Sequence, residues 1–324
     1  MPEIRFQRIA IVGAGAIGTY YGARLALAGA EVRFLVRSGL AELRARGIAL
    51  RGSAGVESLP PERIAAHVTT EEIGPVDLAI ITLKNTANDR LAEVLPPLLG
   101  PQTAILTLQN GLGTDELLAS LFGAERVIGG LAFVAVVREA PGEIRIYTPG
   151  YVTLGEFRRP QTERLRELVA LFRRAGVDCS GVDNLDEARW RKLVWNIPFN
   201  GLTIAAGGVT TDRILDSPEW EREARALIAE IFGAAARFGY VIPPDFVNAQ
   251  IAHTRRMGAY APSSLVDYLA GREVEVEAIW GEPLRRAQAA GAAMPRLEWL
   301  YGRLKELTGR RPGCGSTLGQ EPVG

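Results

Sequence analysis

The chain has 324 residues, of which 47% are hydrophobic and 23% charged, so it is long enough for two domains with separate cores. Its 37 basic and 37 acidic residues balance, which gives no electrostatic reason to expect a nucleic acid or an anionic membrane as a partner. No apolar stretch approaches about 18 residues and the N-terminus lacks a signal-peptide core, so we expect a cytoplasmic protein.

Few metal-binding side chains are present. Cys179 and Cys314 share no ligand or redox spacing, and His67 and His253 are the only imidazoles. We therefore predict no metal site, and we interpret both cysteines as free thiols.

The first predicted strand, at 9–12, runs directly into a glycine-rich turn. Residues 13–18 read G-A-G-A-I-G, and an apolar helix follows as far as Gly29. G-x-G-x-x-G between a strand and a helix is typical of dinucleotide binding, because the glycines permit a tight turn, a close approach to the pyrophosphate and tight helix packing. An ordinary strand-to-helix turn is the alternative. We predict cofactor contacts from Gly13, Ala14, Gly15, Ala16, Ile17 and Gly18.

The next predicted strand, at 31–36, indicates which dinucleotide is bound. An acidic residue about 20 positions beyond the glycines usually binds the ribose hydroxyl of NAD. Here the strand ends in Arg37, whose guanidinium favours the 2′-phosphate of NADP. A solvated arginine at a strand end is the alternative interpretation.

Strands and helices then alternate. A strand at 77–83 ends at Lys84 and is followed by a helix over 87–99. A strand at 104–108 ends shortly before Asn110, and another helix follows. This alternation predicts an α/β fold with a doubly wound parallel sheet, in which ligands bind beyond the carboxyl ends of the strands. Lys84 and Asn110 fall at such ends.

Between 127 and 154 the pattern becomes strand-rich. Turns at Pro141-Gly142 and Pro149-Gly150 predict an antiparallel extension of the sheet. A helix over 162–175 and a short strand at 177–180 complete this part of the chain.

From about residue 184 the chain is mainly helical, with helices expected at 186–199, 218–238, 244–257, 274–290 and 295–307. We therefore predict a Rossmann-type NADP-binding domain over 1–183 and an all-helical substrate and catalytic domain over 184–309. The Gly- and Pro-rich segment 310–324 is predicted to be a disordered tail.

A polar stripe marks the first of these helices. Lys192, Asn196 and Asn200 are four residues apart, which places them on one side of a helix among tryptophans and aliphatic residues. Buried asparagines need hydrogen-bond partners, so the stripe predicts a concave polar site. Pro198 is expected to kink the helix, and it could end the helix before Asn200.

Lysine is rare in this arginine-rich chain. A lysine is needed where a side chain must give up a proton, because arginine stays charged, and Lys192 is one of only three lysines. Chance is the alternative. A solvated helix face is the alternative for the stripe, and it fits the neighbouring Arg189 and Arg191.

A second candidate site spans 261–277. Ser263 and Ser264 could be helix N-caps only. Glu273, Glu275 and Glu277 alternate as in a strand or form the acidic first turn of a helix, and their spacing alone does not choose among them.

Together these segments resemble the ketopantoate reductases (2-dehydropantoate 2-reductases), part of a larger group with a 6-phosphogluconate-dehydrogenase-like helical C-terminal domain. The resemblance covers residues 8–307. It is carried by the order and spacing of segments 13–18, 82–84, 109–111, 189–200 and 263–277.

The resemblance implies hydride transfer from NADPH to the ketone carbon of a 2-keto acid. Lys192 would be the general acid that protonates the developing alkoxide, and Glu275 would be the second catalytic residue. Burial can lower the pKa of a lysine toward neutrality, which suits this role. The substrate would contact Asn110, Asn196, Asn200 and Ser264, and the cofactor would also contact Arg37, Lys84 and Asn110.

Three departures from the family pattern concern substrate recognition. Ala261 stands where the family often has an asparagine, and Thr210 stands where another is expected. The interval from Ser264 to Glu275 is one residue shorter than in the best-known members.

We therefore predict a 2-dehydropantoate 2-reductase of pantothenate biosynthesis, with a reductase of another 2-keto acid as the runner-up. A catalytically silent NADP-binding sensor is the alternative from another class, and the retention of both Lys192 and Glu275 argues against it. Monomer and homodimer both stay open.

Overall fold

The computed structural model describes residues 5–243 and 245–309, and the chain divides into two compact units, Met1–Leu193 and Val194–Gly324. The segment 310–324, predicted as a tail, lies outside the described residues. Over the described ranges, no helix combines the length and the apolar character that a membrane crossing requires.

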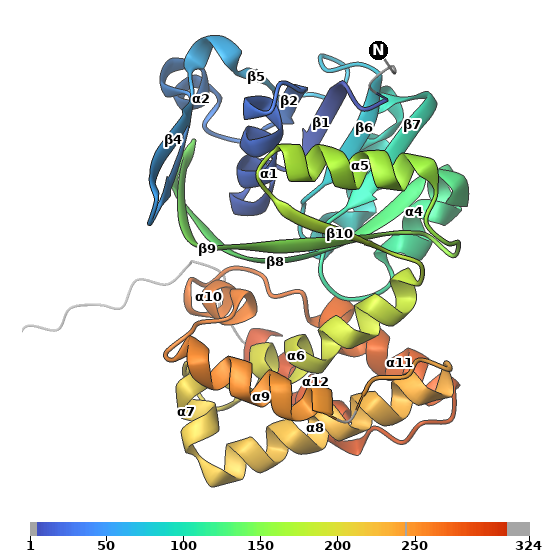
Figure 1. The fold of residues 1–324 in the computed structure, drawn as a ribbon. Helices are drawn as coiled ribbons and strands as arrows, with labels where there is room; N and C mark the ends of the chain where they lie inside the picture. The colour runs from blue at the N-terminus through green and yellow to red at the C-terminus, as the bar shows by residue number, and fades with distance from the viewer. Residues whose placement is uncertain (1–4, 244, 310–324) are drawn as a thin grey trace, which may run out of the picture. The chain divides into compact units, whose positions relative to one another are not determined.

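The first unit is built on one ten-stranded sheet (Figure 1). Along the sheet the strands follow the order β4-β3-β9-β8-β7-β6-β1-β2-β5, and β10 pairs with β9. The strands are β1 (Arg8–Val12), β2 (Glu31–Leu35), β3 (Ile48–Gly52), β4 (Gly55–Leu59), β5 (Ala65–His67), β6 (Val76–Ile81), β7 (Leu99–Thr107), β8 (Val127–Ala140), β9 (Glu143–Glu156) and β10 (Asp178–Val182).

The centre of the sheet is parallel, as the alternation of strands and helices predicts. The pairs β1–β2, β1–β6, β2–β5, β6–β7 and β7–β8 are all parallel. The antiparallel extension is the long β8–β9 hairpin. The predicted α/β fold with a doubly wound sheet is therefore confirmed.

Helices cover both faces of the sheet. They are α1 (Ala16–Leu27), α2 (Leu40–Arg46), α3 (Leu91–Val94), α4 (Thr114–Phe122) and α5 (Glu163–Arg174). Ile9 and Ile11 of β1 belong to a core that includes residues of α1 and α5, which lie over one face in Figure 1. Ala10 and Val12 belong to a second core with residues of α3 and α4. Burial on both faces explains why β1 is continuously apolar.

The helix predicted over 87–99 is broken in the structure. It consists of the 3₁₀ turn η2 (Asn85–Arg90), the single turn α3 and the 3₁₀ turn η3 (Pro96–Leu98). Pro97 follows Pro96, and a proline disfavours helical geometry in the residue before it and lacks a backbone N–H. Consequently β7 begins at Leu99, five residues before the predicted start at 104.

The turn predicted at Pro149-Gly150 is also wrong. Strand β9 continues through these residues, and the pairing with β8 shifts register between Phe133 and Ala135. Gly150 has φ of 57°, and a Cβ there would lie 1.6 Å from the carbonyl oxygen of Phe133. The glycine therefore marks a bulge within the strand and not the end of one.

The second unit is helical, as predicted. Beyond α6 (Leu185–Ala205), which spans the division between the units, its elements are α7 (Thr211–Asp216), α8 (Pro218–Arg237), α9 (Asp245–Met257), α10 (Ser263–Leu269), the π-helical turn η5 (Glu277–Gly281), α11 (Glu282–Ala289) and α12 (Pro295–Gly309). The α8 helix packs against α7, α11 and α12. Trp280 is fully buried and donates a hydrogen bond from Nε1 to the carbonyl oxygen of Ile197, 2.9 Å away.

The division by packing falls inside α6, between Leu193 and Val194, whereas the sequence places the domain boundary at 183/184. The reason is that the start of α6 packs on the sheet. A Cβ on Gly129 of β8 would lie 2.5 Å from a methyl group of Leu185, and one on Gly155 of β9 would lie 3.0 Å from its Cβ. These two glycines are paired across β8 and β9 and let the helix approach closely.

Candidate active site

The glycine turn between β1 and α1 has the geometry of a phosphate cradle. Gly13 has φ of 106°, and a Cβ on Gly18 would lie 2.2 Å from the carbonyl oxygen of Gly13. A Cβ on Gly15 would meet nothing within 4 Å, so the backbone is open at this point. Gly15 caps α1 without a side-chain hydrogen bond, and the first N–H groups of a helix suit a phosphate. The turn therefore fits the pyrophosphate of a dinucleotide.

Arg37 follows the end of β2, which lies next to this cradle. The N–H of Ala14 donates to the carbonyl oxygen of Leu35, 3.3 Å away, so the end of β2 adjoins the glycine turn. Arg37 is exposed, and its side chain makes no hydrogen bond or ion pair with any residue that the structure describes. Its guanidinium is thus available to an anion at the ribose end of the cradle.

Arg138 is a residue of this region that sequence reasoning missed. It lies on β8, and its Nη1 donates to the carbonyl oxygen of Ala14 at 3.1 Å. The contact joins positions 124 residues apart in the sequence, and no local pattern signals it. Arg138 brings a second guanidinium to the glycine turn.

Lys84 and Asn110 lie where the sequence places them, after the ends of β6 and β7. Asn85, the residue after Lys84, donates from Nδ2 to the carbonyl oxygen of Asn110 at 2.7 Å. Asn85 also accepts from the Thr114 hydroxyl at 2.6 Å, and Gln109 donates to Asn88 at 2.8 Å. The two loops are therefore fixed to each other by side chains at the carboxyl edge of the sheet.

Lys192 of α6 points at this edge. Its Nζ donates to Asn110 Oδ1 and to the carbonyl oxygen of Ala132, each at 2.8 Å. Nζ also lies 4.9 Å from the ring centroid of Phe133, which stacks on Tyr151. Lys192 is only 8% exposed. Two oxygen acceptors and an aromatic face thus direct one ammonium group to the edge where the nicotinamide of such folds binds.

Arg189 corrects one expectation from the sequence. It is 5% exposed, so it is not part of a solvated helix face. Its Nη2 donates to Asp115 Oδ1 at 2.7 Å, and its Nε donates to Asp115 Oδ2. The pair is bidentate and buried. Arg191, by contrast, is a partly exposed partner of Glu187.

In the second unit, α6 continues through Pro198 to Ala205, so the proline does not end the helix before Asn200. Asn200 is buried, and its Oδ1 accepts the N–H of Ser264 at 3.0 Å. This bond ties α6 to the start of α10. Asn200 and Ser264 are therefore together, as the prediction requires.

Asn196 is the middle polar residue of the stripe. It is 6% exposed, and within the described residues its side chain makes no hydrogen bond. An amide that makes no hydrogen bond to the described protein can accept or donate one to a bound molecule. Asn196 fits a ligand contact.

The structure separates the three glutamates that spacing leaves equivalent. Glu277 accepts from the Tyr301 hydroxyl at 2.6 Å and from Arg285 at 3.0 Å. Burial alone would raise the pKa of Glu277, but these hydrogen bonds hold it below its ordinary value. Glu273 is exposed, whereas Glu275 is half-buried two residues before the π-helical turn. Glu275 is thus the best placed of the three for a ligand.

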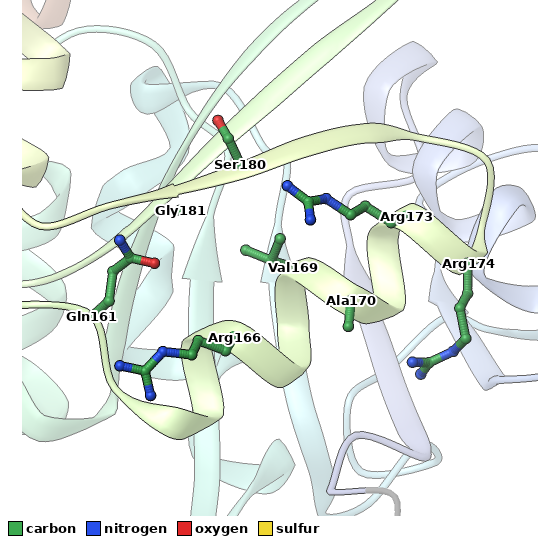
Figure 2. A pocket seen from close by; sticks show the side chains of 8 residues that line it. All are labelled: Gln161, Arg166, Val169, Ala170, Arg173, Arg174, Ser180 and Gly181. Carbon is green, nitrogen blue, oxygen red and sulfur yellow. The ribbon is translucent and has the colours of Figure 1, made fainter.

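A separate concave feature lies between α5 and β10. It is a hollow of about 560 Å³ whose polar lining includes Gln161, Ser180, Arg166, Arg173 and Arg174. Figure 2 shows Gln161 and Arg166 at one end of α5 and Arg174 at the other. Arg166 is paired with Glu163, and Arg173 donates to the carbonyl oxygen of Cys179. None of the predicted site residues lines this hollow.

Cys179 itself is a buried free thiol, as the sequence predicts. Burial raises the pKa of this thiol to about 12, which makes it unreactive near neutral pH. Cys314 lies outside the described residues.

The chain is similar to known proteins over most of its length. Residues 9–159 match the sequence family Ketopantoate reductase PanE/ApbA, and residues 184–308 match its C-terminal family. The chain is 34% identical over 309 residues to a 2-dehydropantoate 2-reductase of Nostoc sp., covering 94% of this chain and 96% of that protein.

Two solved structures are similar over nearly the whole chain. The crystal structure of 2-dehydropantoate 2-reductase from Geobacter metallireducens is 43% identical with a TM-score of 0.89, covering 92% of this chain and 99% of that one. A D-mandelate dehydrogenase solved with NADH and anilino(oxo)acetate has a TM-score of 0.83 over 93% of this chain and 98% of that one. Its identity is 21%, so this second likeness shows the fold alone.

Proposed function

The chain belongs to the ketopantoate reductase family, and we propose that it reduces 2-dehydropantoate to pantoate with NADPH, a step of pantothenate and coenzyme A synthesis. The observation that carries the proposal is the orientation of Lys192. Its Nζ is held by Asn110 and Ala132 at the carboxyl edge of the sheet, where it can serve as a proton donor.

The glycine turn and Arg37 support the choice of cofactor. The open backbone at Gly15 accommodates the pyrophosphate, and Arg37 is the cation for the 2′-phosphate. A bound NADPH supplies the hydride to the ketone carbon. The chain is an oxidoreductase of a nicotinamide dinucleotide, and the preference for NADP over NAD rests on Arg37.

Lys192 supplies the proton. As negative charge develops on the ketone oxygen, an N–H of Lys192 stabilises it and then transfers the proton, which yields the hydroxyl group. The Asn110 side chain and the Ala132 carbonyl fix the direction of Nζ, so little reorganisation is needed during the reaction. Lysine can perform this step because it can lose a proton, whereas arginine cannot.

The second unit supplies the proposed substrate contacts. Asn196 offers an amide that makes no hydrogen bond to the part of the chain that the structure describes, and the Asn200–Ser264 pair offers a preorganised polar group. Glu275 is the proposed carboxylate for a hydroxyl group of the substrate. A hydroxyl-bearing keto acid fits this set better than an apolar one, because amide and carboxylate groups need polar partners.

One observation keeps a reductase of another 2-keto acid as a second candidate. Thr210 stands where the family pattern has an asparagine, and its hydroxyl donates to Asp212 at the start of α7. The Thr210 hydroxyl is thus engaged with a carboxylate of its own helix, α7. The substrate contacts of this chain therefore differ from the family pattern at this position.

A substrate panel tests the proposal. NADPH oxidation is measured with 2-dehydropantoate and with other branched or hydroxylated 2-keto acids, while NADPH affinity is measured separately by fluorescence titration. A preference for 2-dehydropantoate in kcat/KM supports the proposal. Turnover of another acid alone favours the second candidate. Tight NADPH binding without turnover of any acid favours the sensor.

A further inference from the structure

Arg189 of α6 and Asp115 of α4 form a buried, bidentate ion pair. Among the described residues, it is the only such pair that α6 makes with the rest of the first unit. Both side chains are at most 5% exposed, and the guanidinium makes two bonds to the carboxylate. Buried ion pairs are weak contributors to stability, because the desolvation of both charges offsets their attraction. Stability alone therefore gives little reason for this arrangement.

The pair lies directly behind the loop that carries Asn110. Asp115 is in the first turn of α4, which starts immediately after that loop. Arg189 also points Nη1 at the carbonyl oxygen of Gln109, 3.4 Å away. The same loop is held from its other side by the bond from Asn85 to the Asn110 carbonyl. Arg189 and Asn85 thus fix the backbone on both sides of Asn110.

The same arginine fixes the helix that carries Lys192. Arg189 precedes Lys192 by three residues, which is about one turn of α6. Gly129 lets this turn lie close to β8, because a Cβ there would come within 2.9 Å of Arg189 Nη2. The bridge from Arg189 on α6 to Asp115 on α4 therefore helps to set the position of Lys192 Nζ relative to Asn110 Oδ1.

We propose that Arg189 and Asp115 are positioning residues that hold Lys192 and Asn110 in register for proton transfer. Neither residue contacts substrate in this account, and the proposal rests on the proposed reductase function. Proton transfer depends steeply on geometry, and a displacement of about 1 Å at a reacting group costs on the order of 10²-fold in rate. Loss of the pair is therefore expected to lower kcat and to leave NADPH binding intact.

The test replaces both partners at once, in Arg189→Met combined with Asp115→Leu. Removing one partner leaves a buried charge and threatens folding, whereas replacing both with apolar residues is often neutral for stability. We expect a folded protein with NADPH affinity within about twofold of wild type and a kcat lowered on the order of 30- to 100-fold. The matched control is Glu187→Ala with Arg191→Ala, a pair on the same helix, and it is expected to keep the wild-type kcat.

A second variant covers the case in which the double variant does not fold. Arg189→Lys keeps the charge balance, but an ammonium cannot make the two-pronged bond to Asp115 and reach Gln109 as well. We expect about a tenfold loss of kcat with KM and NADPH affinity within about twofold, since the loss arises in the chemical step. A crystal structure of either variant is expected to have Asn110 Oδ1 beyond hydrogen-bond distance of Lys192 Nζ.

A wild-type kcat in either folded variant overturns the proposal, as does a loss that is confined to KM or NADPH affinity. Wild-type protein assayed in parallel separates this failure from a failure of the proposed function. If the wild type reduces no 2-keto acid, the reductase assignment is wrong, and the distance between Asn110 and Lys192 in the variant structure still decides whether the pair positions them.

Discussion

At the scale of single residues, two basic side chains of α6 have different roles in the candidate site. Lys192, the proposed proton donor, has its ammonium directed by two oxygen acceptors. Arg189, three residues earlier, is buried and bidentate. The stripe of Lys192, Asn196 and Asn200 is predictable from spacing, because helical periodicity is local. The burial of Arg189 is not, because Asp115 is distant in the sequence and helix periodicity carries no information about it.

Arg37 provides a test of cofactor choice. In Arg37→Ala we expect KM for NADPH to rise at least about tenfold, because a charge-assisted contact to the 2′-phosphate is lost. KM for NADH is expected to change little, since NADH lacks that phosphate. Steady-state kinetics with both cofactors measures how the ratio of KM for NADPH to KM for NADH changes on substitution. An equal loss with NADPH and NADH would place Arg37 outside the phosphate site.

Tyr21 provides a test of what a buried, unpaired hydroxyl costs in stability. Its hydroxyl is buried without a hydrogen-bond partner among the described residues, and burial raises its pKa. The variant Tyr21→Phe removes the unsatisfied group and leaves the ring in the core, so we expect the free energy of unfolding to rise by about 1 kcal/mol. Urea denaturation measures it. A clear decrease in stability would mean that the hydroxyl has a partner in solution, such as a water molecule.

At the scale of elements, the order of strands and helices is predictable because each buried strand is an apolar run that ends in turn residues. The two departures have different causes, one in the local sequence and one in the pairing of strands. The segment at Pro96-Pro97 loses its helix, and Gly150 becomes a bulge because β9 has a long partner in β8. A turn dipeptide within a strand pattern does not by itself distinguish a bulge from a hairpin turn.

The packing of the start of α6 on strand β8 can be tested at Gly129. In Gly129→Ala the new methyl group would meet Leu185 and Arg189, so the start of α6 must shift. We expect a lower Tm and a kcat reduced several-fold, because Lys192 moves with the helix. Thermal denaturation and steady-state kinetics measure the two effects.

Gly233→Ala is the matched control. This exposed glycine lies on α8, and a Cβ there would meet nothing within 4 Å. Alanine is favoured over glycine in a helix by about 1 kcal/mol, so the control is expected to raise Tm and leave kcat unchanged. If Gly129→Ala changed Tm and kcat in the same way as Gly233→Ala, the close contact of α6 with β8 at Gly129 would be contradicted.

At the scale of the whole molecule, the pH dependence of stability is expected to include a contribution from Glu156. This side chain is fully buried at the end of β9 and accepts hydrogen bonds from Arg164, Thr162 and Arg159. Burial opposes its ionisation, but these bonds outweigh burial and hold the pKa of Glu156 below its ordinary value.

The sign of the effect follows from that direction. A carboxylate whose pKa is lower in the folded state stabilises the fold above its unfolded pKa of about 4.3, and the contribution is lost as pH falls through the folded pKa. Glu156→Gln leaves two arginines without their partner, so we expect a loss of about 3 kcal/mol at neutral pH. Denaturation at pH 7 and at pH 3 is expected to show the difference from wild type shrinking in acid. If Glu156→Gln lost the same free energy of unfolding at pH 7 and at pH 3, the stabilising form of Glu156 would not be the ionised carboxylate.

Two units of different class, and the glycine turn that is proposed to bind the cofactor, can be read from the sequence. The position of the division within α6 could not, because it depends on the fit of Leu185 against two glycines from separate strands. The proposed substrate contacts are a few polar side chains such as Asn196 and Glu275. Their chemistry restricts the class of ligand more than its exact structure.

Whether Lys192 donates the proton is decided by NADPH oxidation with 2-dehydropantoate by the wild type, Lys192→Ala and Glu275→Ala, with NADPH affinity measured in all three. We expect turnover by the wild type and a loss of kcat of at least about 10²-fold in Lys192→Ala, with NADPH affinity unchanged. For Glu275→Ala we expect weaker substrate binding together with a lower kcat. An undiminished kcat in Lys192→Ala would mean that the proton comes from another group and that Lys192 is not the general acid.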